Sequence, residues 1–230
     1  TTKRRYNAQG QHLLRVDEEK FLNCNPDEHK EILESILKLV SKVNIIILSD
    51  YNKGMNVFFP KIIEYANKLG IPTIVDPKIS DQKTYYKATW VKPNRPELNM
   101  FIQKNNNNDL YQNSLYAKDL LGCDNLMVTL GDGGIAIVNN RGEFETQPPV
   151  KQKVLDVTGA GDTVTATLAL AIYNQLNIQE ILNICNIAAG LAVSCKGTTT
   201  VSFSELTLEI LRQFQVKLEV PLSHFINGCR

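Results

Sequence analysis

Residues 154–176 read VLDVTGAGDTVTATLALAIYNQL, a turn of small residues followed by a long apolar-faced run. Gly159 and Gly161, with Ala160 between them, allow a ligand to approach the backbone closely and leave N–H groups unpaired at a helix start. Apolar residues then recur at every fourth position, which predicts a helix buried along one stripe. They are Val164, Leu168, Ile172 and Leu176. The free N–H groups and the positive end of the helix dipole favour an anion such as phosphate.

Asp162 lies in the first turn of this predicted helix, beside the expected anion site. A carboxylate there repels phosphate unless it has a chemical role, such as taking the proton from a hydroxyl that attacks a phosphoryl group. The alternative is an acidic residue that only favours the helix dipole. The four-residue sequence GAGD does not by itself separate the two interpretations. No Walker motif, G-x-x-x-x-G-K-[ST], occurs in the chain.

The composition is that of an ordinary globular chain, with 230 residues, 43% hydrophobic and 21% charged. The net charge of +1 gives no electrostatic reason to expect nucleic acid or a membrane surface as partner. No apolar run reaches the roughly 18–20 residues needed to cross a bilayer. The 5 cysteines lack C-x-x-C spacing, which argues against a disulfide framework or zinc site and for the reducing cytoplasm.

Strands and helices are expected to alternate along the chain, and the strands are apolar. This order predicts an α/β fold around a mostly parallel central sheet flanked by helices. Strands are expected at 44–48, 71–75, 88–91, 126–130, 135–138 and 143–146, after a hairpin of 3–8 and 12–17. Helices are expected at 26–42, 57–69, 109–121, 179–195 and 204–218, besides the one in the opening stretch and a short one after Asn94.

Polar residues follow the ends of four expected strands. Asp50 follows the first and Asp76 the second. Asn94 and Glu97 follow the third, and the glycine-rich turn 131–134 follows the fourth. Each could be a turn or cap residue. Because ligands bind outside the carboxyl ends of strands in open α/β sheets, their joint placement predicts a phosphate-ligand site there.

Three motifs resemble the signatures of the PfkB (ribokinase-like) carbohydrate kinases. DVTGAGD at 156–162 resembles the family's G-A-G-D signature, PNRPE at 93–97 its N-x-x-E motif, and TLGDGG at 129–134 its T-x-G-x-x-G nucleotide loop. Further stretches resemble the heptose-7-phosphate kinase half of ADP-heptose synthase. These are T-x-K-x-R at 1–5, SDYNKG at 49–54, VDPK at 75–78, and NIAAG with KGT within 186–198. The resemblance runs from Thr1 to about Leu206.

The resemblance implies ATP-dependent phosphorylation of a sugar or sugar-phosphate hydroxyl. The first expectation is the conversion of D-glycero-D-manno-heptose 7-phosphate to its 1,7-bisphosphate in ADP-heptose biosynthesis. Two alternatives stay open: a kinase of the same fold acting on ribose, a fructose phosphate or a nucleoside, and a catalytically silent nucleotide-binding half. The sequence hardly separates them, since the residues that choose the sugar lie largely upstream in the family.

The catalytic and nucleotide residues follow from the motifs. The resemblance implies that Asp162 is the general base and that the N–H groups of Gly159, Ala160 and Gly161 hold the transferring phosphoryl group. Residues implied to contact the nucleotide are Thr129, Gly131, Gly133, Gly134, Asn186, Asn94, Glu97 and Lys78.

The resemblance also implies sites for ions and sugar. Asn94 and Glu97 would hold Mg²⁺ through water, and Asp156 and Thr158 would begin a monovalent cation site for K⁺. Residues implied to bind the substrate are Lys3, Arg5, Asp50 and Lys53. The expected partners are a sugar phosphate and ATP, with a homodimer allowed by the resemblance.

The domain expected is a partial ribokinase-like kinase over 1–218, followed by a tail over 219–230. Family members carry roughly a hundred residues before the point that matches Thr1, among them a sugar-binding segment with Gly-Gly-Asn, so the N-terminal part of the fold is expected to be missing. Ile79 follows Lys78 where heptose kinases usually have glycine. No nucleotidyltransferase segment is recognisable after Leu218.

Overall fold

The structure is a computed structural model that describes residues 2–8, 11–18, 24–78, 81–102 and 109–218. The tail expected at 219–230 and Ile79 lie outside the described residues. Among the described helices, none is both long and apolar enough to cross a membrane.

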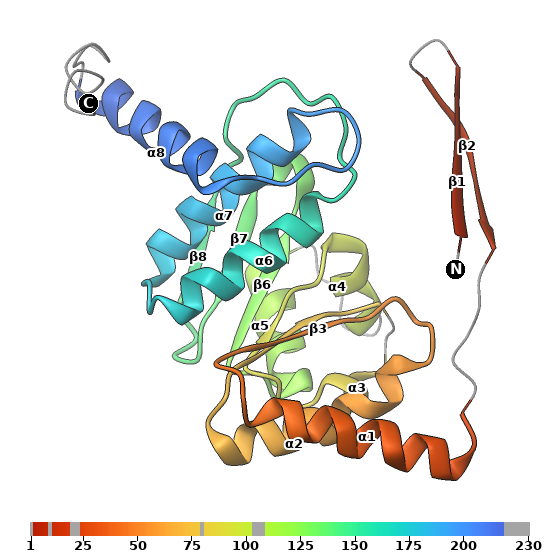
Figure 1. Cartoon of the computed structure of the whole chain (residues 1–230). Helices are drawn as coiled ribbons and strands as arrows, with labels where there is room; N and C mark the ends of the chain where they lie inside the picture. Colours follow the sequence, from red (N-terminus) through yellow and green to blue (C-terminus); the bar gives the residue numbers. More distant parts are fainter. Residues whose placement is uncertain (1, 9–10, 19–23, 79–80, 103–108, 219–230) are drawn as a thin grey trace, which may run out of the picture.

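The centre of the fold is a six-stranded sheet with strand order β3-β4-β5-β6-β7-β8 (Figure 1). The strands are β3 Ile46–Ser49, β4 Thr73–Asp76, β5 Trp90–Val91, β6 Asn125–Thr129, β7 Ile135–Val138 and β8 Phe144–Gln147. β3 to β6 pair in parallel, whereas β7 and β8 join antiparallel as a meander after β6. The mostly parallel sheet predicted from the sequence is confirmed.

Helices cover both faces of this sheet. They are α1 Pro26–Val40, α2 Phe59–Leu69, α3 Gln82–Tyr85, α4 Arg95–Phe101, α5 Leu110–Leu121, α6 Ala160–Tyr173, α7 Ile178–Val193 and α8 Phe203–Leu218, with 3-10 turns η1 Met55–Phe58 and η2 Gly131–Gly133. The expected helices are all present, with ends that differ by a few residues.

Alternation along the strands divides the core into two layers. Leu126 and Val128 of β6 pack on one face with residues of α2, α4 and α5. Met127, between them, packs on the other face with Val164 and Leu168 of α6 and with residues of α7. Successive side chains of a strand point to opposite faces, so a strand covered on both sides must be apolar throughout. This explains why the parallel strands read as continuous apolar runs.

The opening stretch forms α6, but this helix ends at Tyr173 and not at Leu176 as expected. Gln175 has φ +57°, a left-handed conformation that stops the helix. Leu176 nonetheless packs against the core cluster below α6, since its N–H bonds back to the carbonyl of Ala171. The apolar repeat therefore predicted burial correctly and helix length incorrectly.

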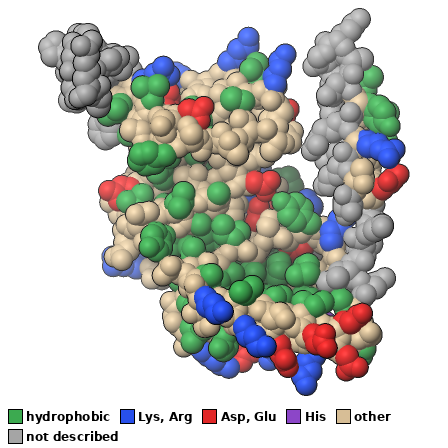
Figure 2. All heavy atoms as spheres, viewed as in Figure 1, with side chains coloured by type: hydrophobic (Ala, Val, Ile, Leu, Met, Phe, Trp, Pro, Cys, Tyr) green, Lys and Arg blue, Asp and Glu red, His purple; other side chains and the backbone are tan. Residues whose placement is uncertain are grey.

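The N-terminal hairpin predicted from the sequence is present, formed by β1 Thr2–Ala8 and β2 Gln11–Glu18. Figure 1 shows it standing to the side of the sheet domain. Apolar side chains are also exposed in and after β3, at Ile47, Tyr51, Met55 and Val57. Figure 2 shows hydrophobic side chains across the middle of this view, between α1 and α6.

Candidate functional site

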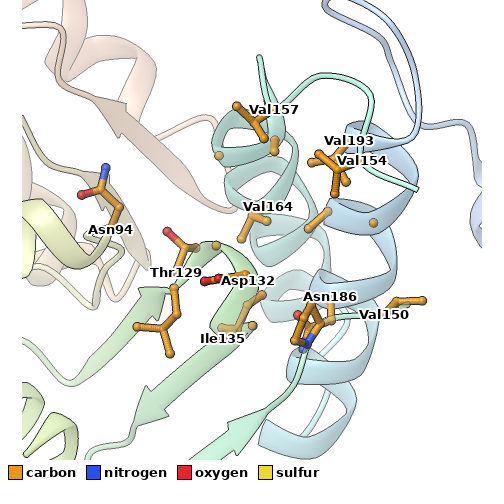
Figure 3. A pocket seen from close by; sticks show the side chains of 18 of the residues that line it. Asn94, Thr129, Asp132, Ile135, Val150, Val154, Val157, Val164, Asn186 and Val193 are labelled. Atoms are coloured by element: carbon orange, nitrogen blue, oxygen red, sulfur yellow. The ribbon is translucent and has the colours of Figure 1, made fainter. Parts of the chain in front are cut away.

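A cavity of about 790 Å³ opens at the carboxyl end of β6, between the turn after that strand, the start of α6 and the side of α7. Thr129 and Asp132 lie on one side of it, and Val154 and Val193 lie on the opposite side (Figure 3). Its lining includes seven of the residues predicted from the motifs. They are Asn94, Thr129, Gly131, Gly134, Ala160, Gly161 and Asn186. Asn94 and the turn after β6 therefore share one cavity with the start of α6, whereas Asp50, Asp76 and Glu97 of the predicted strand-end site do not line it.

The start of α6 forms the anion-binding end of this cavity. Gly159 is the N-cap residue, has φ +83°, and provides no side-chain cap for the helix N–H groups. The Thr163 N–H donates to the Gly159 carbonyl at 2.9 Å, so the helix is regular from its first turn. The Ala160 N–H donates to the Val157 carbonyl at 3.3 Å, so this donor would have to exchange that partner to bind a ligand. An N-terminus without a side-chain cap leaves its other backbone donors for a ligand, and a helix dipole points its positive end the same way.

Asp162 lies in this first turn with an exposed side chain. The Tyr51 hydroxyl, in the loop after β3, donates to Asp162 Oδ1 at 3.5 Å. The carboxylate is therefore available to a reactant that comes from the side of β3, while Ala160 and Gly161 face the cavity.

The glycine-rich turn after β6 is shaped by its backbone. Gly131 and Gly134 have φ +63° and +84°, in the left-handed region that favours glycine. A Cβ on Gly134 would collide with the carbonyl oxygen of Gln147 on β8. Gly133 has a different setting, since a Cβ there would lie 3.0 Å from Leu130 Cβ, and it is not among the residues that line the cavity.

Asn186 reaches the cavity from the middle of α7 and is 3% exposed. Its Nδ2 donates to the carbonyl of Gln147 at 3.3 Å, which fixes the amide plane. Beside it, burial raises the pKa of the Cys185 thiol to about 12, so that this neighbour stays neutral. Asn186 is thus a neutral, oriented amide in a mostly apolar wall.

Asn94 and Glu97 form the start of α4 as a capping box. The Asn94 N–H donates to Glu97 Oε2 and the Glu97 N–H to Asn94 Oδ1, both at 2.9 Å. Lys78 Nζ lies 3.7 Å from Glu97 Oε1, which brings three predicted residues together. Carboxylate and amide oxygens suit Mg²⁺, and because both are already engaged in the cap they fit contact through water better than direct ligation.

Two predicted carboxylates are directed to internal partners. Asp50, 7% exposed, accepts hydrogen bonds from the Tyr85 hydroxyl and, at 2.6 Å, from the Asn52 N–H. Asp156 accepts from the N–H groups of Thr158 at 2.9 Å and Gly197 at 3.0 Å. These bonds shape the two loops that flank α6. No group of three or more His, Cys, Asp or Glu side chains that could hold a metal occurs among the described residues.

The remaining predicted residues lie farther from this geometry. Lys53 is half-buried in the loop between Asp50 and η1. The backbone of Lys3 and Arg5 belongs to β1, whereas their side chains lie outside the described part of the structure.

Lys92 was not among the residues predicted from the sequence, although it lies at the end of β5 and is only 3% exposed. Its Nζ lies 3.0 Å from Asp76 Oδ1. The signal in the sequence was a charge placed directly after an apolar strand and before Pro93. Lysine is almost never fully buried without a partner, so this position pointed to an ion pair.

Proteins of similar sequence include two with the same printed name, "Bifunctional protein HldE". The one from Aliarcobacter butzleri is 38% identical over 212 residues, which cover 89% of this chain and 43% of the relative. The one from Helicobacter pylori strain Shi470 is 34% identical over 246 residues, covering the whole chain and 52% of the relative. The chain thus spans about half the length of these relatives.

Solved structures with the same fold include a ribokinase of Arabidopsis thaliana complexed with ribose and ATP. Its TM-score is 0.69 at 22% identity, and the match covers 77% of this chain and 59% of that one. Phosphofructokinase-2 of Escherichia coli in complex with potassium gives a TM-score of 0.74 at 20% identity, covering 88% and 67%. The fold is ribokinase-like. Since residues 7–205 match the model of the pfkB family carbohydrate kinases, the chain belongs to that family.

Proposed function

We propose that this chain catalyses, in the protein to which it belongs, the transfer of the γ-phosphoryl group of ATP to a hydroxyl of a sugar phosphate. The observation that carries the proposal is the start of α6, where an N-terminus without a side-chain cap opens into the cavity and Asp162 stands in the same turn. Phosphoryl transfer needs positioning and charge stabilisation more than covalent chemistry, and this turn offers both.

The apolar side of the cavity suits a nucleobase. Val154, Val193 and Ala189 line it, and Asn186 supplies one oriented amide. From there the phosphates would extend past Gly131 to the N–H groups of α6. Mostly apolar walls with a few fixed polar groups are typical of cofactor sites.

In the reaction, the sugar hydroxyl oxygen attacks the γ-phosphorus while its proton passes to Asp162. The bond from that phosphorus to the bridging oxygen breaks, and ADP leaves. The N–H groups of Gly159, Ala160 and Gly161 would bind the transferring oxygens. Asn94 and Glu97 would hold Mg²⁺ through water, where the ion neutralises charge on the triphosphate, and Lys78 would add a point charge nearby. Asp156 and Thr158 would hold K⁺.

For the acceptor we propose D-glycero-D-manno-heptose 7-phosphate, phosphorylated at its anomeric hydroxyl in ADP-heptose biosynthesis. This rests on the motifs at 49–54 and 75–78 and on relatives that carry the name HldE. Lys3, Arg5, Asp50 and Lys53 would contribute to the sugar side. We also propose that the protein is a homodimer. We propose a cytoplasmic location because the cysteines lack disulfide spacing.

The test measures ADP release with ATP and Mg²⁺ for four acceptors: heptose 7-phosphate, ribose, fructose 6-phosphate and a nucleoside. We expect the highest kcat/KM with the heptose phosphate, a requirement for Mg²⁺, and stimulation by K⁺ over an equal concentration of Na⁺. A higher kcat/KM with another acceptor would change the substrate and keep the reaction. ATP binding without turnover on any acceptor would instead support the silent nucleotide-binding half.

A further inference from the structure

An ion pair between a buried lysine and an aspartate whose side chain is 19% exposed lies next to the start of α6. Lys92, at the end of β5, is 3% exposed, and its Nζ lies 3.0 Å from Asp76 Oδ1 at the end of β4. The Lys92 N–H also donates to the carbonyl of Val75 at 2.8 Å, which holds this residue in line with the sheet. Such a pair is weak evidence for stability, because the cost of taking the lysine charge out of water offsets the attraction between the two charges. Its presence here calls for another explanation.

The two charges lie near different turns of α6. A Cβ built on Gly161 would lie 3.8 Å from Lys92 Nζ, so the ammonium is close to the first turn. Gly161 also lines the cavity. Asp76 reaches the next turn, where its Oδ2 is 3.4 Å from the Thr165 hydroxyl. That hydroxyl also lies 3.0 Å from the carbonyl oxygen of Gly161.

This arrangement orients the pair along α6. The positive end faces the turn that carries the anion-binding N–H groups, and the negative end faces the helix body. The field of the pair therefore adds to the helix dipole at the cavity, and burial of the Lys92 side chain limits the screening of its charge by water. The Thr165 hydroxyl has one proton to donate and lies within reach of both the Gly161 carbonyl and Asp76, so it links this turn to the end of β4.

We propose that Lys92, paired with Asp76, is a positioning residue for the phosphoryl group: it strengthens and orients the anion site at the start of α6 through Gly161. The proposal deepens the kinase function and rests on it. It predicts that the pair contributes to binding of the γ-phosphate and to turnover, and contributes little to binding of the rest of the nucleotide.

The main variant is the double change Lys92→Met/Asp76→Asn, which removes both charges and keeps the side-chain sizes. Its matched control is Lys61→Met/Glu64→Gln, the equivalent charge removals in an exposed pair on α2 with a 2.9 Å contact, where Glu64 also pairs with Lys68. Each protein is melted without ligand and titrated, with Mg²⁺, against ADP and a non-hydrolysable ATP analogue. The dissociation constant for ADP divided by that for the ATP analogue, here called the γ-phosphate ratio, measures how much the γ-phosphate contributes to binding.

For the double variant we expect ADP affinity within about twofold of wild type. The γ-phosphate ratio and kcat should both fall about tenfold, less than the 10²–10³ typical of removing a direct donor to the reacting group. The control should match wild type in all three measurements. If the double variant keeps both ratio and kcat within about twofold, the proposal is wrong.

Lys92→Arg guards against a double variant that fails to fold, because it keeps both the positive charge and a partner for Asp76. Since a positive charge remains beside Gly161, the γ-phosphate ratio should stay within about twofold of wild type. A ratio that falls tenfold would show that the positive charge is not the cause and would overturn the proposal. A wild-type protein without turnover would refute the kinase function alone, since the binding ratios would still test the pair.

Discussion

Replacing Asp162 by asparagine tests the centre of the proposed mechanism. The side chain is exposed and its hydrogen bond from the Tyr51 hydroxyl is long, at 3.5 Å, so little structure depends on it. The loss of a favourable charge in the first turn of α6 should cost no more than about 1 kcal/mol of stability. Loss of a general base typically costs 10²–10⁴-fold in rate, or roughly 3–5 kcal/mol of barrier. The kinetic effect should therefore exceed the stability effect severalfold.

The assay compares kcat, the dissociation constant of an ATP analogue and the melting temperature for wild type and Asp162→Asn. We expect kcat to fall at least a hundredfold. Nucleotide affinity should hold or improve, because a negative charge beside the phosphates disappears. Asp27→Asn is the matched control, since Asp27 is also an exposed acid in the first turn of a helix, α1. It should show the same small stability loss with unchanged turnover. Turnover of Asp162→Asn within about threefold of wild type would remove this residue from the mechanism.

Three further predictions concern the metal, a turn and the buried thiols. Glu97→Gln should raise the Mg²⁺ concentration needed for half-maximal turnover more than it raises KM for the sugar, because Glu97 is proposed to hold the metal. Equal changes in the two quantities would contradict that role. Gly134→Ala should lower the free energy of unfolding by about 1–3 kcal/mol, because the left-handed backbone is strained and the new Cβ meets a carbonyl of β8. Gly142, with φ +76° and open space around it, is the control, and Gly142→Ala should cost less stability in a urea titration. A larger loss for Gly142→Ala would refute the steric argument. Burial raises the pKa of the Cys123 and Cys185 thiols from 9.0 to about 12, so their protonation stabilises the fold below about pH 9 and that contribution is lost as pH rises toward 12. Between pH 9 and 12 the urea midpoint should fall less steeply in a variant with both cysteines changed to alanine than in wild type. An equal decline in the two proteins would show that these thiols do not cause it.

The sequence predicted the sheet and the cavity because both depend on patterns that are local. The apolar repeat in Val154–Leu176 predicted a helix there. The alternation of strands and helices predicted a parallel sheet, which brings the polar residues after the strands to one edge. The predicted end of α6 was wrong because Gln175 adopts a left-handed conformation, which the apolar repeat does not indicate.

Interactions between distant segments were beyond sequence reasoning. Nothing near Asp50 in the chain indicates that its carboxylate accepts from the Tyr85 hydroxyl, 35 positions away. The pair of Lys92 and Asp76 joins two strand ends that meet only after the sheet has formed. Such contacts depend on three-dimensional packing, so the sequence indicates the residue types and the fold decides the partners.

The change of strand direction at β6 has a consequence for folding kinetics. β6, β7 and β8 form a meander within residues 125–147, whereas each parallel pairing from β3 to β6 must wait for a helical crossover. Contacts close in sequence form before those that require long loops to close. We expect the amides of Ile135–Val138 to gain protection from hydrogen exchange earlier during refolding than those of Ile46–Ser49. If β3 is protected first in a pulse-labelling experiment, assembly of the sheet starts from its parallel edge instead.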